Sequence, residues 1–178
     1  MTNDIDYILI SEQQIKDKLR ELGEKISQDY KGKNLLVISV LKGAAVFMAD
    51  IIRNINIPLQ IDFMVVSSYG SGTTTSNSVK IIKDLDIDIK DFDILIVEDI
   101  LDSGVTLSNL IKVLNSRNPK SVKVCSLLSK PERHKVEVPL EYLGFEVPDE
   151  FVVGYGLDYA ELYRNLPYIG VLKREIYS

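Results

Sequence analysis

The stretch ILIVEDILDSGVTLSNL, residues 94–110, joins an apolar strand pattern to an apolar helix pattern through an acidic turn that contains a glycine. The run DILIVED (93–99) is too short for a helix of ordinary length and suits a strand that is buried on both faces. A stripe at helical spacing follows it, formed by Leu107, Leu110, Ile111 and Leu114. The segment therefore predicts a strand, a turn and a helix in succession, as in α/β folds.

The same alternation of patterns extends to both sides of this segment. A helix is predicted over residues 12–30, with Ser11 as its N-cap. Strands that alternate with helices form parallel sheets through right-handed crossovers. We therefore predict an α/β fold with a twisted, mainly parallel central sheet flanked by helices. The further patterns are apolar strand runs at 35–41 (LLVISVL), 59–69 (LQIDFMVVSSY) and 121–129 (SVKVCSLLS), and an apolar helix pattern at 44–55 (AAVFMADIIRNI) after Gly43.

The chain length of 178 residues fits one domain, since domains average roughly 150 residues. We predict a single domain over residues 1–178, with its core at about 35–130. Residues 131–178 are rich in proline and aromatic residues and, with the N-terminus, should form a small hood over the strand ends. The polar stretch 67–78 (SSYGSGTTTSNS) has the composition of a mobile active-site lid, although an inert hairpin tip fits it equally well.

Composition excludes several kinds of partner and site. The chain carries 21 basic and 26 acidic residues, a net charge of −5, which argues against a general binder of nucleic acid or membrane surfaces. The single cysteine, Cys125, and the single histidine, His134, exclude an intramolecular disulfide and a Cys/His zinc cluster. We find neither a leader pattern nor an apolar stretch of roughly 20 residues, so we expect a cytoplasmic protein.

Several common ligand-binding motifs do not occur in the sequence. There is no P-loop and no nucleophile elbow, and the glycine pairs at Gly70 and Gly154 lack the third glycine of a dinucleotide-binding turn. The run Asp84, Asp86, Asp88 resembles the start of a calcium loop, but isoleucine stands where glycine is required. We interpret this acidic run as a half-exposed strand end.

The acidic turn after the 93–99 strand carries the strongest chemical signal. Glu98 and Asp99 end the strand pattern, where α/β sheets bind ligands. Residues 103–106 should lie at a helix N-terminus, whose free N–H groups favour a phosphate. Carboxylates beside a phosphate make sense if they bind ribose hydroxyls, a magnesium ion or a proton in transfer. The simpler alternative is that Asp102 or Ser103 only caps the helix, beside a solvated acidic turn.

The segment VEDILDSGVTL (97–107) resembles the phosphoribosyl-pyrophosphate signature of the type I phosphoribosyltransferase family. Because a third acid, Asp102, is present, the resemblance is to the hypoxanthine-guanine branch. Other family motifs are matched in order by Leu41-Lys42-Gly43, Ser68-Tyr69-Gly70, Lys130 and FVVGYGLDYAELYRNL (151–166). The resemblance covers about residues 35–172 and implies the family's fold and its phosphoribosyl transfer.

The resemblance also implies a role for each matching residue. The ribose and 5′-phosphate site would comprise Glu98, Asp99, Asp102, Ser103, Gly104, Val105 and Thr106. The pyrophosphate site would comprise Lys42, Gly43 and Arg164, and the purine site Lys130, Phe151, Val152 and Asp158. The flap would begin at Ser68 and Tyr69, and Mg²⁺ would be held by Glu98, Asp99 and Asp158, largely through substrate and water. In the family, the peptide bond matching Leu41-Lys42 can be cis.

The implied reaction transfers the 5-phosphoribosyl group from phosphoribosyl pyrophosphate to N9 of hypoxanthine or guanine, giving IMP or GMP in purine salvage. Asp102 would be the catalytic residue, accepting the proton of purine N7. Lys130 would donate to O6 of a 6-oxopurine and so reject adenine. Because the family tends to form dimers and tetramers, a homodimer or homotetramer is expected.

Two alternatives to this reading stay open. A sibling transferase could prefer xanthine, because SKPERHK (129–135) differs in detail from the family pattern. A regulator that binds RNA could keep the phosphoribosyl-pyrophosphate signature, although Asp102, Lys130 and the acidic net charge favour an enzyme. Val105 stands where some relatives have lysine, so one phosphate contact is absent, and Arg133 and the expected surface residue His134 receive no catalytic role.

Overall fold

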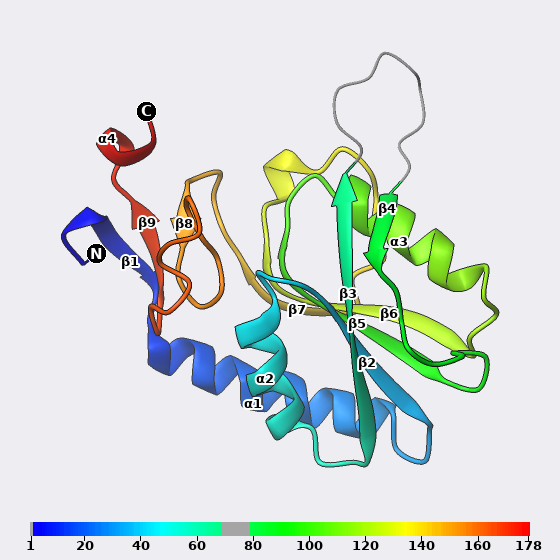
Figure 1. The fold of residues 1–178 in the computed structure, drawn as a ribbon. Coiled ribbons are helices and arrows are strands. Elements are labelled where there is room, and N and C mark those ends of the chain that lie inside the picture. The colour runs from blue at the N-terminus through cyan, green and yellow to red at the C-terminus, as the bar shows by residue number, and fades with distance from the viewer. Residues whose placement is uncertain (1, 69–78) are drawn as a thin grey trace.

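The computed structural model describes residues 2–68 and 79–178, and its centre is a six-stranded sheet (Figure 1). The strands are β2 (Leu35–Val40), β3 (Leu59–Ser68), β4 (Val79–Lys83), β5 (Asp93–Leu101), β6 (Ser121–Ser129) and β7 (Tyr142–Glu146). They lie in the order β4-β3-β2-β5-β6-β7, and every neighbouring pair is parallel except β3 and β4. The predicted α/β fold with a mainly parallel sheet is confirmed.

Helices cover both faces of this sheet. Leu35 and Val37 of β2 belong to one buried cluster, whereas Leu36 and Ile38 belong to the other. Since successive side chains of a strand point to opposite faces, this explains why the strand reads as a continuous apolar run. The first cluster includes residues of α1 (Glu12–Asp29) and α2 (Ala45–Asn54), and the second includes residues of α3 (Val105–Asn115). No helix of the described residues is long and apolar enough to cross a membrane.

The first helix begins where its sequence predicts. Ser11 Oγ accepts a hydrogen bond of 3.2 Å from the Gln14 backbone N–H, and Gln14 Oε1 accepts one of 2.8 Å from the Ser11 N–H. This reciprocal capping box satisfies two N–H groups that the first turn leaves without helical partners. The predicted N-cap at Ser11 is therefore confirmed.

A second, smaller sheet forms the hood beside the main sheet (Figure 1). Its three antiparallel strands are β1 (Ile5–Ile10), β9 (Ile169–Leu172) and β8 (Val152–Val153), in that order. The hood thus combines segments from both ends of the chain, and the short helices Thr2–Asp4 and α4 (Arg174–Tyr177) flank it. Residues 142–146, which we expected in the hood, instead form β7 at the edge of the main sheet, parallel to β6.

Strand β5 is two residues longer than the DILIVED run that predicted it. Ile100 and Leu101 continue the parallel pairing, opposite Leu128 and Ser129 of β6. The acidic pair Glu98 and Asp99 therefore lies within the strand, not at its end as the sequence suggested. The charged residues Glu98 and Asp99 do not end the strand, because a strand in a buried sheet can carry polar side chains where it borders a pocket.

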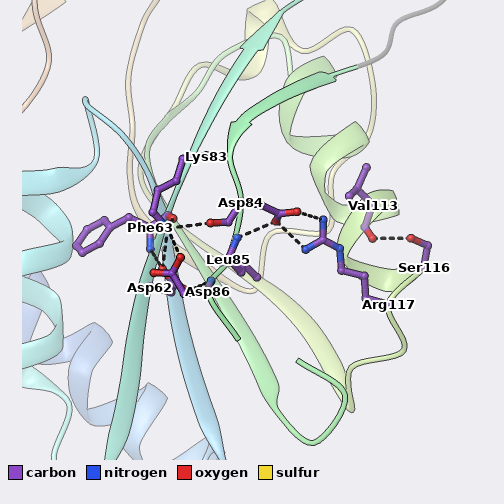
Figure 2. A network of polar contacts seen from close by, with 9 residues as sticks. All are labelled: Asp62, Phe63, Lys83, Asp84, Leu85, Asp86, Val113, Ser116 and Arg117. Carbon is purple, nitrogen blue, oxygen red and sulfur yellow. Dashed lines mark hydrogen bonds and ion pairs between the residues drawn. The ribbon is translucent and has the colours of Figure 1, made fainter. Parts of the chain in front are cut away.

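The acidic run after β4 is a turn that links the β3–β4 hairpin to the segment that follows α3, and our interpretation of it as a strand end is wrong (Figure 2). Arg117 donates to both carboxylate oxygens of Asp84, at 2.7 and 2.8 Å. Lys83 Nζ lies 3.3 Å from Asp62 Oδ1 and 3.4 Å from Asp86 Oδ1, and it also donates to two backbone carbonyls. Asp84 and Asp86 are therefore held by one cation on β4 and one in the segment that follows α3.

Candidate active site

Three neighbouring parallel strands end at one edge of the main sheet, and predicted site residues lie on or just after them. β2 leads into Lys42, and β6 leads into Lys130. Between them, β5 carries Glu98 and Asp99 and leads into Asp102. The carboxyl edge of a parallel sheet is the usual place for a ligand, because helix N-termini and polar loops meet there.

A pocket of about 400 Å³ opens at the end of β5. It is lined by five residues predicted for the ribose and 5′-phosphate site, namely Glu98, Asp102, Ser103, Gly104 and Thr106. Three of these residues, Asp102, Ser103 and Gly104, form the turn between β5 and α3, and Thr106 lies in the first turn of α3. The contiguous segment thus builds most of one pocket by itself.

Backbone geometry at Gly104 shapes this pocket. Gly104 is the N-cap of α3 and has a left-handed φ of +77°, which glycine adopts at little cost. A Cβ there would lie 3.0 Å from Val138 Cγ2 and 3.1 Å from the Val136 carbonyl oxygen. Among the described residues, no side chain caps α3 from the Gly104 position, so the alternative of an Asp102 or Ser103 N-cap is wrong. The only local bond there is a long one, 3.4 Å, from the Val105 N–H to Ser103 Oγ.

Glu98 and Asp99 form a crowded acidic pair. Burial raises the pKa of Glu98 well above its usual range, and the neighbouring charge of Asp99 raises it further. Burial also raises the pKa of Asp99, while its bond from the Ile100 N–H, 2.8 Å long, and the charge of Arg164 oppose that rise. Such a pair favours a proton, hydroxyl donors or a cation as its partner.

The loop after β2 packs against this acidic pair. A Cβ on Gly43 would lie 1.8 Å from Asp99 Oδ2, so only glycine lets the carboxylate lie this close to the loop. A Cβ on Gly156 would in turn lie 2.1 Å from the Gly43 carbonyl oxygen. The peptide bond Leu41-Lys42 is cis, as it can be in the family. Three segments that are far apart in the chain therefore converge here.

The two cations predicted for pyrophosphate are paired with acidic groups of the 158–164 loop. Lys42 Nζ lies 2.8 Å from Glu161 Oε2. Arg164 Nη2 lies 3.0 Å from Asp158 Oδ1 and 3.2 Å from Glu161 Oε1, and Arg164 Nη1 donates to the Gly156 carbonyl at 2.7 Å. The pyrophosphate end of the site therefore already carries a carboxylate between its cations.

A second pocket, of about 150 Å³, adjoins the first. It is lined by Ile100, Asp102, Lys130, Phe151, Val152, Leu157 and Asp158, which include every residue predicted for the purine. Ile100 and Asp102 line both pockets, so the two cavities meet at these residues. Asp102 thus lies between the predicted phosphoribosyl site and the predicted base site.

Polar and aromatic contacts fix the walls of the second pocket. Lys130, whose side chain is only 12% exposed, donates to the Glu150 carbonyl oxygen at 2.7 Å. Phe151 stacks on Tyr177 of α4 with ring centroids 4.8 Å apart, and it meets Tyr159 edge-on at 5.5 Å. The rings hold Phe151 in place at the mouth of the pocket.

Asp102 has a partner that the sequence analysis left without a role. Arg133 Nε donates to Asp102 Oδ1 at 2.6 Å, and Arg133 Nη1 donates to Asp149 Oδ1 at 3.4 Å. The backbone N–H of Lys135 also donates to the Ser103 carbonyl, at 3.0 Å. The loop after β6 therefore braces the turn that carries Asp102. His134 is exposed, as expected.

The predicted metal ligands do not form a ready-made metal centre. Across residues 2–68 and 79–178, no three carboxylate, histidine or cysteine side chains gather closely enough to hold an ion. Glu98, Asp99 and Asp158 are hard oxygen donors of the kind Mg²⁺ uses, and burial raises the pKa of the first two. The donor chemistry fits magnesium that is bound mainly through substrate and water.

The predicted flap is reached only at its first residue. Ser68 ends β3, and Tyr69 lies outside the described residues, as does the rest of the 69–78 stretch. The lid expected over 67–78 therefore stays a prediction.

Sequence reasoning missed Glu161, Arg133 and Gly156. A signal for the first was available, because Asp158, Glu161 and Arg164 recur at intervals of three within one predicted motif. Arg133 and Gly156 gave no comparable signal, since their partners Asp102 and Gly43 are distant in the sequence.

Known proteins resemble this chain along its whole length. It is 55% identical to the hypoxanthine-guanine phosphoribosyltransferase of Bacillus subtilis, over all of this chain and 99% of that one. It is 56% identical to the bifunctional protein TilS/HprT of Listeria monocytogenes, of which it spans only 28%. A crystal structure of a Staphylococcus aureus hypoxanthine phosphoribosyltransferase superposes with a TM-score of 0.96 at 50% identity, covering 100% of this chain and 97% of that one.

The family model described as phosphoribosyl transferase domain matches residues 9–160. This range contains the β5–α3 turn, both pockets and the acidic pair. The chain therefore belongs to the phosphoribosyl transferase family.

Proposed function

We propose that residues 1–178 work as one domain that transfers the 5-phosphoribosyl group of phosphoribosyl pyrophosphate to N9 of hypoxanthine or guanine, giving IMP or GMP in purine salvage. The observation that carries this proposal is the position of Asp102, which lines both adjoining pockets. On one side lies the phosphate-type turn at Gly104, and on the other lies Lys130. The full-length relative from Bacillus subtilis, named as a hypoxanthine-guanine phosphoribosyltransferase, supports the same reaction.

The phosphoribosyl end would be held by the β5–α3 turn. The hydroxyls of Ser103 and Thr106 and the N–H groups at the start of α3 would bind the 5′-phosphate, and the Val105 N–H would exchange its long bond to Ser103 Oγ for a phosphate oxygen. Glu98 and Asp99 would accept hydrogen bonds from the ribose hydroxyls and favour the positive charge that develops at C1 in the transition state. Lys42, the Gly43 backbone and Arg164 would hold the pyrophosphate.

At the reaction centre one bond would break, one bond would form, and one proton would move to Asp102. The bond from ribose C1 to the pyrophosphate oxygen breaks, and pyrophosphate leaves with that electron pair. The bond from purine N9 to C1 forms, and the N7 proton moves to the Asp102 carboxylate. Asp102 would contribute a proton acceptor placed beside N7, and Arg133 would orient the Asp102 carboxylate.

Base selectivity would come from the second pocket. Lys130 Nζ, held close to its acceptor on Glu150, would turn part of its donor capacity to O6 of a 6-oxopurine. Adenine presents an amino donor at that place, so the Lys130 N–H that faces the base would find no acceptor there. Phe151 would stack on the purine ring, and Val152 and Asp158 would line its edge.

Magnesium fits the oxygen donors at this edge of the sheet. Glu98, Asp99 and Asp158 would hold it largely through water and substrate. When bound, Mg²⁺ neutralises charge on the leaving pyrophosphate. We further propose a cytoplasmic homodimer or homotetramer that binds neither nucleic acid nor membrane, in line with the net charge of −5.

Initial rates with phosphoribosyl pyrophosphate, Mg²⁺ and hypoxanthine, guanine, xanthine, adenine or uracil test the proposal. We expect hypoxanthine and guanine to react and adenine to react at least about 100-fold more slowly, since an unpaired buried polar group is strongly disfavoured. Lys130→Met should lower the rate with 6-oxopurines far more than the rate with adenine. Fastest turnover of xanthine would favour a xanthine transferase, and binding of substrate without turnover of any base would favour an RNA-binding regulator.

A further inference from the structure

Glu161 bridges the two cations of the pyrophosphate end. Its Oε2 lies 2.8 Å from Lys42 Nζ, and its Oε1 lies 3.2 Å from Arg164 Nη2. Lys42 follows β2, whereas Arg164 lies in the C-terminal loop, so one carboxylate joins two distant segments. The hydrogen bond and charge of Lys42 lower the pKa of Glu161, with a smaller contribution from Arg164, so the carboxylate is ionised at neutral pH.

The backbone delivers this carboxylate through a tight turn. Glu161 has a left-handed φ of +66°, and the preceding Ala160 has a φ of +51°, an uncommon conformation for residues with side chains. The Glu161 N–H donates to Asp158 Oδ2 at 2.9 Å, which holds the turn closed. The side chain itself is 63% exposed and belongs to no buried cluster, so it adds little to the core.

We infer that Glu161 is a built-in substitute for the pyrophosphate of the substrate, an inference that rests on the proposed function of Lys42 and Arg164. A carboxylate offers the same kind of acceptor oxygens as a phosphate, and cations of this type bind both. Through its two ion pairs, Glu161 keeps the two cations ordered and close together when pyrophosphate is not bound. Pyrophosphate must displace it, because like charges beside the same cations repel.

Two consequences follow from this exchange of partners. Glu161 competes with pyrophosphate and weakens its binding, both as part of the substrate and as the product. It also restores the empty arrangement when the product departs, and so favours release. The pair with Lys42 is exposed and the pair with Arg164 is partly exposed, and each such pair corresponds to about a fivefold change in an equilibrium constant. We therefore expect a modest effect, about two- to tenfold for both contacts together.

Calorimetric titration with inorganic pyrophosphate and Mg²⁺ tests the inference on the full chain. Glu161→Gln keeps the shape and the left-handed backbone but removes the charge, and it should bind pyrophosphate about two- to tenfold more tightly than the wild type. Glu24→Gln, which removes an exposed carboxylate of α1 outside the site, is the matched control and should bind as the wild type does. Thermal unfolding of Glu161→Gln should match that of the wild type.

A double-mutant cycle separates competition from a general charge effect. In a Lys42→Met background, Glu161→Gln should tighten pyrophosphate binding by a smaller factor, because one of the two cations for which Glu161 competes is gone. In turnover, Glu161→Gln should lower KM for phosphoribosyl pyrophosphate without raising kcat. Equal or weaker pyrophosphate binding by Glu161→Gln would overturn the inference while leaving the proposed function intact. A wild type that binds no pyrophosphate would overturn both.

Discussion

The two anion-binding ends of the site are built in opposite ways. The proposed phosphate end is the backbone turn at Gly104, part of one contiguous segment, where the Val105 N–H makes one long bond, 3.4 Å, to Ser103 Oγ. The proposed pyrophosphate end consists of the side chains of Lys42 and Arg164, which come from distant segments and already share the carboxylate of Glu161. The Gly104 turn is preformed and carries no full charge. The Lys42 and Arg164 cations are already neutralised in part by the Glu161 carboxylate.

The difference follows from electrostatics. Backbone N–H groups can stay without a bound anion at little cost in free energy, because the helix itself orients them and they carry only partial charge. Two cations held together repel each other unless an anion lies between them. A group that must stay bound through the reaction suits the first design, whereas a leaving group suits the second, since its departure leaves cations that need a partner.

The largest effect should come from Asp102, which lines both the phosphoribosyl pocket and the base pocket. Asp102→Asn removes the proton acceptor and should lower kcat with hypoxanthine by about 10²- to 10⁴-fold, the usual contribution of general-base catalysis. Because Asp102 is not among the residues proposed to hold pyrophosphate, pyrophosphate affinity by calorimetry should change less than about twofold. A near-normal kcat would show that another group takes the N7 proton. A large change in pyrophosphate affinity would show that the two ends are not independent.

A substitution at the phosphate end should have the next largest effect. Gly104→Ala places a side chain at φ +77° against Val136 and Val138. A left-handed conformation costs a residue with a side chain about 1–2 kcal/mol. We expect KM for phosphoribosyl pyrophosphate to rise about five- to thirtyfold, in proportion to that free energy.

Gly32→Ala is the matched control for Gly104→Ala. Gly32 has nearly the same φ, +76°, but a Cβ there would have nothing within 4 Å. It should lower the free energy of unfolding by a similar amount and leave KM unchanged. A rise of KM in both variants would mean that loss of stability, not the shape of the turn, weakens substrate binding.

The same contrast explains how far the sequence predicted the site. The phosphate end was predictable because strand, acidic pair, glycine turn and helix follow one another between Ile94 and Leu110. The exchange partner Glu161 was not, because its role depends on a contact with Lys42, 119 residues away. Fold-level prediction failed at β7 for a related reason. Gly144 usually argues against a strand, yet here a Cβ would lie 2.3 Å from the Leu127 carbonyl oxygen, so glycine permits close packing.

Stability should respond to the acidic pair with a pH dependence of known sign. Because the pKa of Glu98 is raised in the folded protein, the folded form keeps its proton to higher pH than the unfolded chain, whose pKa is about 4.3. As pH rises above that value, the unfolded chain ionises first and the folded protein loses stability. Glu98→Gln removes this loss and should raise Tm at pH 7.5 by a few degrees without Mg²⁺, at roughly 2–4 °C per kcal/mol.

The same variant should match the wild type more closely at pH 4 and should turn over more slowly at any pH, since the ribose hydroxyls lose an acceptor. Glu24→Gln is again the control for a lost exposed carboxylate. An unchanged or lower Tm for Glu98→Gln at pH 7.5 would mean that the folded protein already stabilises the charge of Glu98.

The smallest effect should come from the ion pair of Arg117 with Asp84, for which no substrate group competes. Arg117, which follows α3, forms a bidentate pair with Asp84, which follows β4 (Figure 2). Their side chains are 30% and 48% exposed. The hydrogen bond from Arg117 lowers the pKa of Asp84. The stabilisation is therefore complete above the unfolded pKa of about 3.9 and is lost as pH falls through the folded value. Arg117→Met and Asp84→Asn should each lower the free energy of unfolding by about 0.5 kcal/mol, because exposed pairs contribute little.

Denaturant titration of these two single variants and their double variant, beside Glu161→Gln, completes the comparison. The double variant should lose little more stability than either single variant, because the two residues share one interaction. Pyrophosphate affinity should not change in any of the three. Glu161→Gln should show the reverse pattern, with altered pyrophosphate affinity and unaltered stability. The two ion pairs have similar N–O distances, 2.7 Å at Asp84 and 2.8 Å at Glu161, although the Glu161 pair is more exposed. Such a result would show that a stronger anion competes for the cations of Glu161, whereas only water competes at Asp84.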